Sequence, residues 1–444
     1  QIIVFYLLQP TMTLTSPPFA INLPSDCQDR LHYMRALFTS HAGDDLTEDW
    51  PGGRAEGLRR LTQMQPVSYG KNRNFLNGQV TRLSPYLRHG CLNLGEAIQA
   101  TKKLASSGAD KLLFEFAWRD YWRQVWYFVG DRIHSEMEPP KVKLDRKAID
   151  TEIVEAKTGL NCIDHFVSEL ESTGYLHNHA RMWLASYCVH YRKIAWLPAA
   201  QWLYGHLLDG DLASNHLSWQ WVGRTFSSKP YLFNAANVSK YASVEWHCQN
   251  TPIDTTYEVL ENLAFSPDVM PHTPRASLLQ DPVPELFTTP PKDLVEKFAF
   301  IKKVDPKKLL GKTNIALIHP WNLKDQEGPF FQLGIIDLGF HQRFAWSRKR
   351  WEFVLTRMKH ICRDILMADL STTLIPLIEQ NPHLNFEITQ TYNPSYFELI
   401  KRLEVYENTL VHPIPRFLDD PENLCPSFSK FWQQVTSKNS YPRP

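Results

Sequence analysis

The stretch LDGDLASNHLSWQW, from Leu208 to Trp221, decides the fold of the first half of this chain. An aspartate is a good helix cap, so the sequence predicts a helix that begins directly after the Asp-Gly-Asp run. Asp211, Asn215 and Trp219 then recur at four-residue intervals and share one face of that helix. A carboxylate, an amide and an indole on one face favour contact with a polar, aromatic ligand. Burial of the indoles in a core is the alternative for this segment taken alone.

Four further blocks accompany this stretch in a fixed order. They are TRLSPYLRHG (81–90), FEFAWRDYWR (114–123), KTGLNCIDHFVSELESTGYLHNHARMWLASY (157–187) and the single Trp196. Together with the Asp-Gly-Asp run, the asparagine that follows it and the Trp-Gln-Trp, they resemble the FAD-binding helical domain of the DNA photolyase and cryptochrome family. The resemblance extends roughly over residues 60–245. It implies FAD as the cofactor and UV-damaged DNA as a partner.

The hydrophobic pattern predicts a multi-domain chain. After an N-terminal extension (1–26), residues 27–250 are predicted to form the all-α, photolyase-like FAD-binding domain. Nine prolines between Thr251 and Lys312 predict a surface linker over 251–312. Residues 313–444 alternate short β-type runs with helical ones, which predicts a smaller α/β domain with a Rossmann-like, mostly parallel sheet. The family places its α/β domain first, so the reversed order leaves an antenna chromophore undecided.

Charge and cysteine content limit the classes of function. The 48 basic and 47 acidic residues nearly cancel, so any DNA-binding surface must be local. The seven cysteines include no C-x-x-C pair, which supports neither a disulfide framework nor a zinc site, and no metal is expected. A reducing compartment, the cytoplasm or another one that holds DNA, fits best. The apolar opening Ile2 to Leu8 is too short to span a membrane, so no membrane association is expected.

The resemblance also implies which residues hold FAD. The segment Val80–Ser84 matches the loop that binds the diphosphate, although the family has Thr or Ser where this chain has Val80, and a helix N-terminus suits phosphates. Arg181 and Asp209 match an ion pair that lies against the isoalloxazine ring. Asn215 matches the residue that faces flavin N5, where a neutral amide favours the repair branch. The implied cofactor-binding set is Tyr69, Val80, Thr81, Arg82, Leu83, Ser84, Arg119, Asn178, Arg181, Asp209, Gly210, Asp211 and Asn215.

A second helical pattern carries a candidate DNA-lesion site. One face collects Glu115, Trp118, Arg119 and Trp122, and the opposite stripe of Phe114, Ala117, Tyr121 and Val125 is apolar enough to seat the helix, so the first face is predicted to be open to a ligand. A flipped-out base needs aromatic walls and a polar group for its edge. By resemblance, the catalytic set is Glu115, Trp118, Met182, Asn215 and Trp221, and the DNA-binding set is Arg73, Glu115, Trp118, Arg119, Trp122, Asn178 and His179.

Two positions besides Val80 depart from the family pattern. His179 stands where the family usually has arginine, which predicts weak or pH-dependent phosphate binding, with single-stranded or distorted DNA as the alternative substrate. By resemblance, Trp219 and Trp196 are the first two of three indoles that reduce the flavin in light. The third position holds Lys143 instead. Alternative electron exits are Tyr191, Trp202 and Tyr204, for each of which core packing is the rival interpretation.

The leading hypothesis is therefore a deoxyribodipyrimidine photolyase, a lyase that splits cyclobutane pyrimidine dimers by electron transfer from reduced FAD. The first alternative is a cryptochrome-like blue-light photoreceptor that binds FAD without repairing DNA. A flavin-carrying interaction module is the second. The sequence leaves open whether cyclobutane dimers or (6-4) products are preferred.

Overall fold

The computed structural model describes residues 50–437, apart from 106, 143, 145, 274 and 280–283. The predictions for residues 1–49, which include the N-terminal extension, and for Lys143 lie outside the described residues. No helix within the described part of the chain is long and apolar enough to cross a membrane. The six cysteines in that part are all buried, free thiols.

The first half of the described chain is helical, as the sequence predicts. Asp211 caps the helix that follows the Asp-Gly-Asp run, because its carboxylate accepts a hydrogen bond from the Ser214 amide at 2.8 Å. The helices are α3 (Arg54–Thr62), α4 (Pro66–Asn72), α5 (Ser84–Arg88), α6 (Leu94–Leu104), α7 (Asp110–Val129), η1 (Gly130–His134), α8 (Thr151–Val154), α9 (Asn161–Thr173), α10 (Asn178–Ser186), η2 (Tyr187–Tyr191), α11 (Trp196–His206), α12 (Leu212–Val222), α13 (Ala235–Tyr241), η3 (Val244–Trp246) and α14 (Tyr257–Phe265).

The second half contains the predicted parallel sheet. Its five strands, β2 (Asn314–Ile318), β3 (Phe331–Asp337), β5 (Asp364–Ala368), β6 (Asn385–Thr389) and β7 (Thr409–His412), are arranged in the order β5-β3-β2-β6-β7, and every neighbouring pair is parallel. The strand order reverses direction between β2 and β6, and sheets of this kind bind ligands at the carboxyl ends of the strands at such a point. The parallel sheet is confirmed, whereas its Rossmann-like character stays a prediction.

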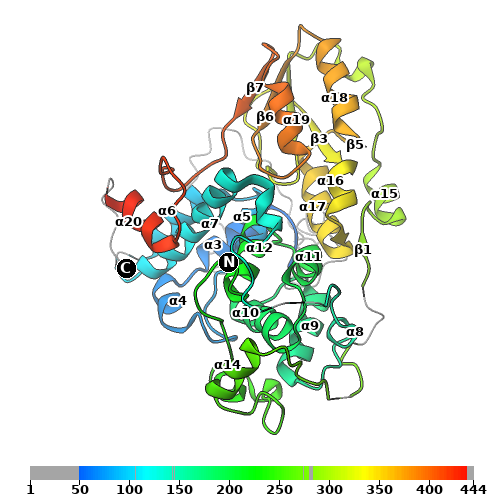
Figure 1. Ribbon diagram of the computed structural model, residues 1–444. Helices are drawn as coiled ribbons and strands as arrows, with labels where there is room; N and C mark the ends of the chain where they lie inside the picture. Colours follow the sequence, from blue (N-terminus) through cyan, green and yellow to red (C-terminus); the bar gives the residue numbers. More distant parts are fainter. Residues whose placement is uncertain are drawn as a thin grey trace, which may run out of the picture. The chain divides into compact units, whose positions relative to one another are not determined.

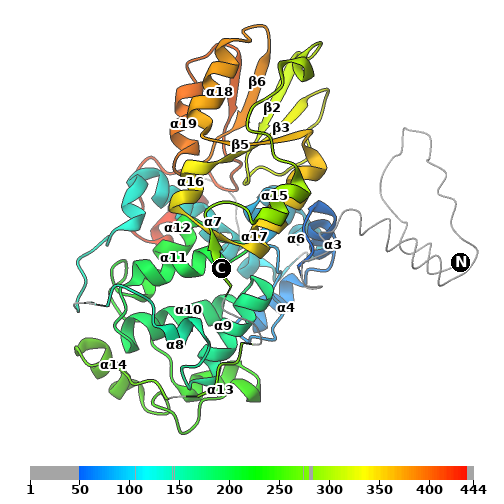
Figure 2. The same ribbon diagram turned by 90° about the vertical axis from the view of Figure 1, so that its right-hand side faces the viewer.

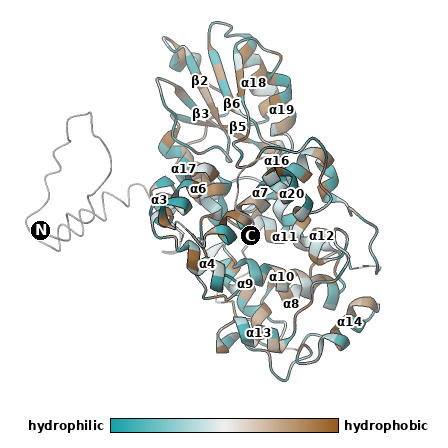
Figure 3. Cartoon of the chain, turned by 90° about the vertical axis from the view of Figure 1, so that its left-hand side faces the viewer, coloured by the Kyte–Doolittle hydropathy of each residue, from teal (hydrophilic) through white to brown (hydrophobic). Residues whose placement is uncertain are grey.

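Helices surround this sheet (Figures 1 and 2). The pair α18 (Leu370–Glu379) and α19 (Tyr396–Leu403) lies together beside the strands, and α17 (Arg348–Ile361) packs against β3 and β5. The remaining elements are β1 (Leu286–Phe287), α15 (Lys292–Phe298), η4 (Pro306–Leu309), α16 (Leu338–Arg343), β4 (Trp346–Ser347) and α20 (Phe428–Ser437). The Pro-rich interval 251–312 therefore contains all of α14 and α15, and so is not an unstructured linker. Helix α14 carries hydrophobic residues (Figure 3), and three of its large apolar side chains, Tyr257, Val259 and Phe265, are exposed.

Two hydrophobic cores hold these elements. One contains buried residues of α9 to α13, including Trp196 and Trp219. The other runs from α5 and α7 through the parallel sheet and α17 to α20, so the helical half and the α/β half share it. Their backbones approach closely at Gly90, where a Cβ atom would lie 2.8 Å from the carbonyl oxygen of Trp321. Only glycine fits at that point.

Candidate flavin and DNA-lesion site

The loop from Asp209 to Asp211 connects α11 to α12 and carries two carboxylates, of which Asp209 is buried and Asp211 is partly exposed. Arg181, on α10, donates a hydrogen bond from Nη2 to Asp209 Oδ2 at 2.9 Å. Burial raises the pKa of Asp209, but the charge of Arg181 and the hydrogen bonds from Arg181 and Ser84 outweigh burial and hold the pKa below its usual value. Asp209 is therefore ionised at neutral pH. Its second oxygen, Oδ1, is buried and has no partner among the described residues.

Asp211 is the second carboxylate and has two roles. It caps α12, and its Oδ2 pairs with Nη1 of Arg88 at 3.0 Å. Burial again opposes ionisation, but the charges of Arg88 and Arg119 and the hydrogen bonds from Ser214 lower the pKa of Asp211. The partly buried Arg119 guanidinium lies within range of the charges of both Asp209 and Asp211. The predicted Arg181, Asp209, Asp211 and Arg119 thus meet in one place.

A buried arginine from the other half of the chain holds the middle of this loop. Arg350, on α17, donates to the carbonyl oxygen of Gly210 at 2.6 Å and to that of Tyr204 at 2.8 Å. Arg88 donates to the same Gly210 oxygen at 2.9 Å. A Cβ on Gly210 would lie 2.4 Å from Nη1 of Arg350, so this position requires glycine. The loop is therefore built by both halves of the molecule.

The charges at the loop suit FAD. Four guanidiniums, those of Arg88, Arg119, Arg181 and Arg350, surround the two carboxylates, which leaves an excess of positive charge. A ligand that brings anionic phosphates would balance that excess. The unpartnered Oδ1 of Asp209 calls for a hydrogen-bond donor, because a buried carboxylate oxygen without one is costly. FAD has a diphosphate as well as N–H and hydroxyl donors, so the residues present fit it.

The predicted diphosphate loop lies next to this arrangement. Ser84 begins α5 and lies near enough to Asp209 to contribute to the lowering of its pKa. Leu83 is fully buried, whereas Val80 and Thr81 are partly exposed and Arg82 is exposed, with φ of 51°. Val80, Thr81 and Arg82 line a polar hollow of about 270 Å³ together with Arg59 and Arg60. The proximity of Ser84 to Asp209 joins the two predicted parts of the cofactor site.

The carboxylate of Glu115 lies in a second cluster, on α7. Its Oε1 lies 3.4 Å from Nε of Arg73 and 3.0 Å from Nζ of Lys111. Burial and the nearby charge of Glu115 raise the pKa of Tyr69. Tyr69, Arg73 and Glu115 therefore form a group, although Lys111 was not among the predicted residues. The signal for Lys111 was its position four residues before Glu115 on the same helix.

The prediction that this face of α7 is open is wrong at its two indoles, Trp118 and Trp122. The ring of Phe428, on α20, stacks on the indole of Trp118 with centroids 4.0 Å apart and an interplanar angle of 8°. Trp122 is only 8% exposed and also contacts Trp118. Figures 1 and 3 show α20 beside α7. The physical reason is that α20 has an apolar face which needs cover, and the sequence interpretation did not identify that helix.

The other predicted residues take separate positions. Asn178 is exposed, with its amide 3.9 Å from the sulfur of the partly buried Met182. Trp221 is 39% exposed and contacts Tyr231. Trp219 and Trp196 are both buried in the core of α9 to α13.

His179 and Asn215 are held by neutral groups. Asn215 Nδ2 donates to the carbonyl oxygen of Ala200 at 2.8 Å, which leaves Oδ1 of the same amide as an acceptor. The ring nitrogens of His179 contact the Asn74 carbonyl oxygen at 2.7 Å and the Tyr231 hydroxyl at 3.1 Å. Burial lowers the pKa of His179, and the hydrogen bond to Asn74 opposes this only in part.

A cavity of about 150 Å³ adjoins the loop at the switch point of the sheet. Arg119 and Asp211 line it from the helical half. Asn322 and Tyr392, which follow β2 and β6, line it from the α/β half. The flavin loop and the carboxyl ends of the strands therefore face a common space.

Comparison with known proteins agrees with this geometry. Residues 112–246 match the family described as the FAD binding domain of DNA photolyase. The chain is 29% identical to a deoxyribodipyrimidine photo-lyase of Streptomyces griseus over 45% of its own length and 42% of that protein. It is 31% identical to the cryptochrome DASH of Gloeobacter violaceus over 38% of its own length and 37% of that protein. The match thus spans about two fifths of these relatives.

Among solved structures, a bacterial class III photolyase from Agrobacterium tumefaciens matches with 20% identity, 53% coverage of this chain and 55% of that one, and a TM-score of 0.42, which is too low to support a detailed comparison. The family match and the sequence relatives agree with the residues at the Asp209–Asp211 loop. Residues 112–246 therefore carry a FAD-binding domain of the photolyase and cryptochrome type.

Proposed function

We propose that this protein is a deoxyribodipyrimidine photolyase, which uses light and reduced FAD to split cyclobutane pyrimidine dimers in DNA. The observation that carries the proposal is the Asp209–Asp211 loop, where two ionised carboxylates lie among four guanidiniums and one carboxylate oxygen has no partner within the described part of the chain. The charges of this loop suit FAD, and the splitting of a pyrimidine dimer by light depends on that cofactor. The photolyase named among the relatives supports the choice of reaction.

Each side chain has a task in this proposal. Arg181 and Asp209 orient the flavin ring, and the Oδ1 of Asn215 accepts a hydrogen bond from it. When bound and reduced, FAD supplies the electron that opens the dimer and takes it back afterwards. Glu115 hydrogen-bonds the edge of the flipped pyrimidines, and its ion pairs with Arg73 and Lys111 hold its carboxylate in place.

The remaining pocket residues bind the lesion and the strand around it. Trp118 stacks on the bases, and Met182 and Trp221 close the pocket. Arg73, Asn178 and His179 face the DNA strand. The net charge of the chain is near zero, so we expect the protein to contact only a short stretch of the DNA backbone. A short contact does not require an intact duplex, and the proposed substrates therefore include single-stranded or distorted DNA. The free thiols of the described residues favour a reducing compartment that holds DNA, such as the cytoplasm.

The test is a repair assay on a UV-damaged oligonucleotide. Protein loaded with FAD and chemically reduced is illuminated with blue light or kept dark, and restored pyrimidines are counted. We expect repair in light only, and a loss of about tenfold or more for Glu115→Gln. Glu96→Gln is the matched control, because Glu96 is as exposed as Glu115 and is also paired with an arginine, Arg54. Equal repair by the two variants would contradict the role of Glu115.

The structure gives one observation in favour of a cryptochrome-like photoreceptor. Phe428 covers the ring of Trp118 on which a base would stack. A protein that only signals has no need of that ring. Bound, reducible FAD together with binding of damaged DNA but no restored pyrimidines would favour this second function.

A further inference from the structure

Two cysteines that lie 86 positions apart in the sequence meet at the start of α9. Cys162 is the second residue of α9, and its amide N–H donates a hydrogen bond to Sγ of Cys248 at 3.4 Å. The N-cap residue, Leu160, has no side-chain acceptor to offer, so the sulfur of Cys248 satisfies an amide of the first turn. Sγ of Cys248 also lies 3.4 Å from the carbonyl oxygen of Trp246. The sulfur is therefore held in one position against α9.

The two thiols lie near enough to shift each other's pKa in opposite directions. Burial and the neighbouring Cys248 raise the pKa of Cys162. The pKa of Cys248 is lowered, because the thiol of Cys162 and the amides at the start of α9 stabilise its thiolate more than burial and the charge of Asp164 oppose it. The thiolate is the reactive form of cysteine, so Cys248 is the nucleophile of the pair and Cys162 its partner.

An exposed turn adjoins this buried pair. Both cysteine side chains are buried, but Gln249 and Asn250, the two residues after Cys248, are exposed. Asn250 has a left-handed backbone, with φ of 59°, which L side chains rarely adopt. Local opening of such a turn costs less than opening of the core. The turn therefore gives a molecule as small as hydrogen peroxide a route to Sγ of Cys248.

We propose that Cys162 and Cys248 are a redox site that forms a reversible disulfide, with a peroxide as the oxidant. The thiolate of Cys248 attacks one oxygen of hydrogen peroxide, the O–O bond breaks, hydroxide leaves, and a sulfenic acid forms on Cys248. Sγ of Cys162 then gives up its proton and attacks Sγ of Cys248, so that an S–S bond forms and the hydroxyl group leaves as water. The two sulfurs lose two electrons in all, and the peroxide is reduced to water. A reducing dithiol reverses the bond.

The position of the bond in the chain gives it a consequence for the flavin domain. A link between Cys162 and Cys248 closes a loop that contains α10 to α13 and the Asp209–Asp211 loop. A disulfide limits the freedom of the unfolded chain within the loop that it closes, so it opposes unfolding of these helices. Peroxide is an oxidant that a flavin-binding protein meets, because reduced flavins react with oxygen. In a reducing compartment the pair rests as two thiols.

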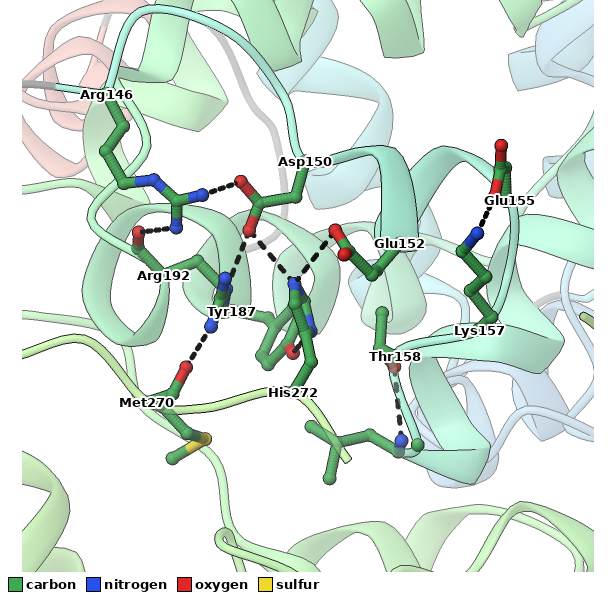
Figure 4. A network of polar contacts seen from close by, with 12 residues as sticks. Arg146, Asp150, Glu152, Glu155, Lys157, Thr158, Tyr187, Arg192, Met270 and His272 are labelled. Atoms are coloured by element: carbon green, nitrogen blue, oxygen red, sulfur yellow. Dashed lines mark hydrogen bonds and ion pairs between the residues drawn. The ribbon is translucent and has the colours of Figure 1, made fainter. Parts of the chain in front are cut away.

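Cys188 is the matched control for this chemistry. It is fully buried in the same core as Cys162 and Cys248. Burial and the charge of Asp150 raise the pKa of Cys188. Figure 4 shows Asp150 in a network of its own, in which it pairs with Arg146 and Arg192. Cys188 is therefore expected to stay reduced under conditions that oxidise Cys248.

The experiment treats the full-length, reduced protein with hydrogen peroxide, blocks the remaining thiols with an alkylating reagent and digests the chain with trypsin. Trypsin places Cys162 on peptide 158–181, Cys248 on peptide 241–275 and Cys188 on peptide 182–192. Mass spectrometry should find the first two peptides joined and Cys188 alkylated, and dithiothreitol should separate the joined pair. The melting temperature of the oxidised protein should be higher by about 5 °C, and dithiothreitol should abolish this gain.

Serine variants separate the roles of the two thiols. Cys162→Ser removes the thiol that attacks the sulfenic acid, so peroxide should leave Cys248 as a sulfenic acid that dimedone traps. In Cys248→Ser, Cys162 should stay reduced at the same peroxide concentration. Cys188→Ser should form the disulfide as the wild type does.

Three results would overturn the inference: a wild type in which Cys162 and Cys248 are both alkylated after peroxide treatment, a joined peptide pair that appears only when the protein is oxidised in denaturant, or oxidation of Cys162 in Cys248→Ser. The first two need only the wild type, so they decide the matter even where a variant fails to fold. The inference goes beyond repair of DNA and does not depend on it, because the peptides are identified without light, DNA or turnover.

Discussion

The ring of Phe428 lies parallel to the indole of Trp118, with 4.0 Å between their centroids. Phe428 begins α20, and it also contacts Phe114 and Tyr121 on α7. A stacked pair of aromatic rings contributes about 0.5–1.5 kcal/mol, whereas a nucleobase stacked on an aromatic side chain contributes about 1–3 kcal/mol. A base therefore competes with Phe428 for Trp118, and part of its binding energy is spent on displacing that ring.

Phe428→Ala should expose Trp118 and strengthen binding of a UV-damaged oligonucleotide about fivefold, the equivalent of about 1 kcal/mol. It should also destabilise the fold by about 3 kcal/mol, because a buried phenyl ring is lost. Fluorescence anisotropy measures the affinity. Phe431→Ala is the control, since Phe431 is on the same helix and contacts Tyr121. An equal effect of the two substitutions on affinity would show that Phe428 does not screen Trp118.

Arg350→Met should weaken FAD binding about tenfold or more, although Arg350 belongs to the α/β half. The substitution removes the donors that hold the Tyr204 and Gly210 carbonyl oxygens, so the carboxylates beside Gly210 lose their fixed positions. Arg357→Met is matched to it, because Arg357 is also buried on α17 but donates to the carbonyl oxygen of Leu323. Flavin fluorescence titration gives both dissociation constants. A similar loss of FAD affinity in the two variants would mean that Arg350→Met acts by destabilising the fold in general and not through the Asp209–Asp211 loop.

DNA affinity should not change with pH between 6 and 8. Burial lowers the pKa of His179, so the ring takes up a proton less readily than an exposed histidine and adds little charge that could bind phosphate. Of the two outcomes that the sequence predicts for His179, weak phosphate binding is therefore favoured over pH-dependent phosphate binding. Binding isotherms at pH 6, 7 and 8 test it. A clear gain in DNA affinity on acidification that is abolished by His179→Gln would contradict this prediction, because it would mean that His179 becomes protonated when DNA is bound.

Glu171 should make the fold less stable as the pH rises. Burial raises its pKa to about 8, and both of its carboxylate oxygens are without a partner among the described residues. Between the unfolded pKa, near 4.5, and pH 8 the unfolded state releases this proton while the folded state keeps it, so unfolding becomes easier as the pH rises.

Glu171→Gln should therefore be about 2 kcal/mol more stable than the wild type at pH 7.5 and no more stable at pH 4.5. Denaturant unfolding at the two pH values measures this. A difference that stays constant with pH would rule out titration of Glu171.

Local signals explain what the sequence predicts well. The cap at Asp211 lies within three residues of its partner, and helices such as α17 and strands such as β2 are recognisable from their own hydrophobic patterns. The predicted pairing of Arg181 with Asp209 was also found, through the family resemblance. These features depend on short-range chemistry or on a motif that is present in the chain itself.

Long-range packing explains what the sequence analysis missed. The strand β3 contains Gly334, which weakens its pattern, yet a Cβ there would lie 2.9 Å from Met358, so the packing of α17 requires the glycine. The covering of Trp118 by Phe428 joins residues more than 300 positions apart. Arg350 reaches Gly210 from a different half of the chain. None of these contacts leaves a periodic signal in the sequence.

A titration of the purified protein with FAD, followed by the visible spectrum, tests the central claim that the Asp209–Asp211 loop holds the flavin. We predict one FAD per chain and an affinity at least about tenfold lower for Asp209→Asn, which leaves the Arg181 charge without its carboxylate. A protein that stays colourless in excess FAD, or an Asp209→Asn variant that binds FAD as tightly as the wild type, would contradict the account.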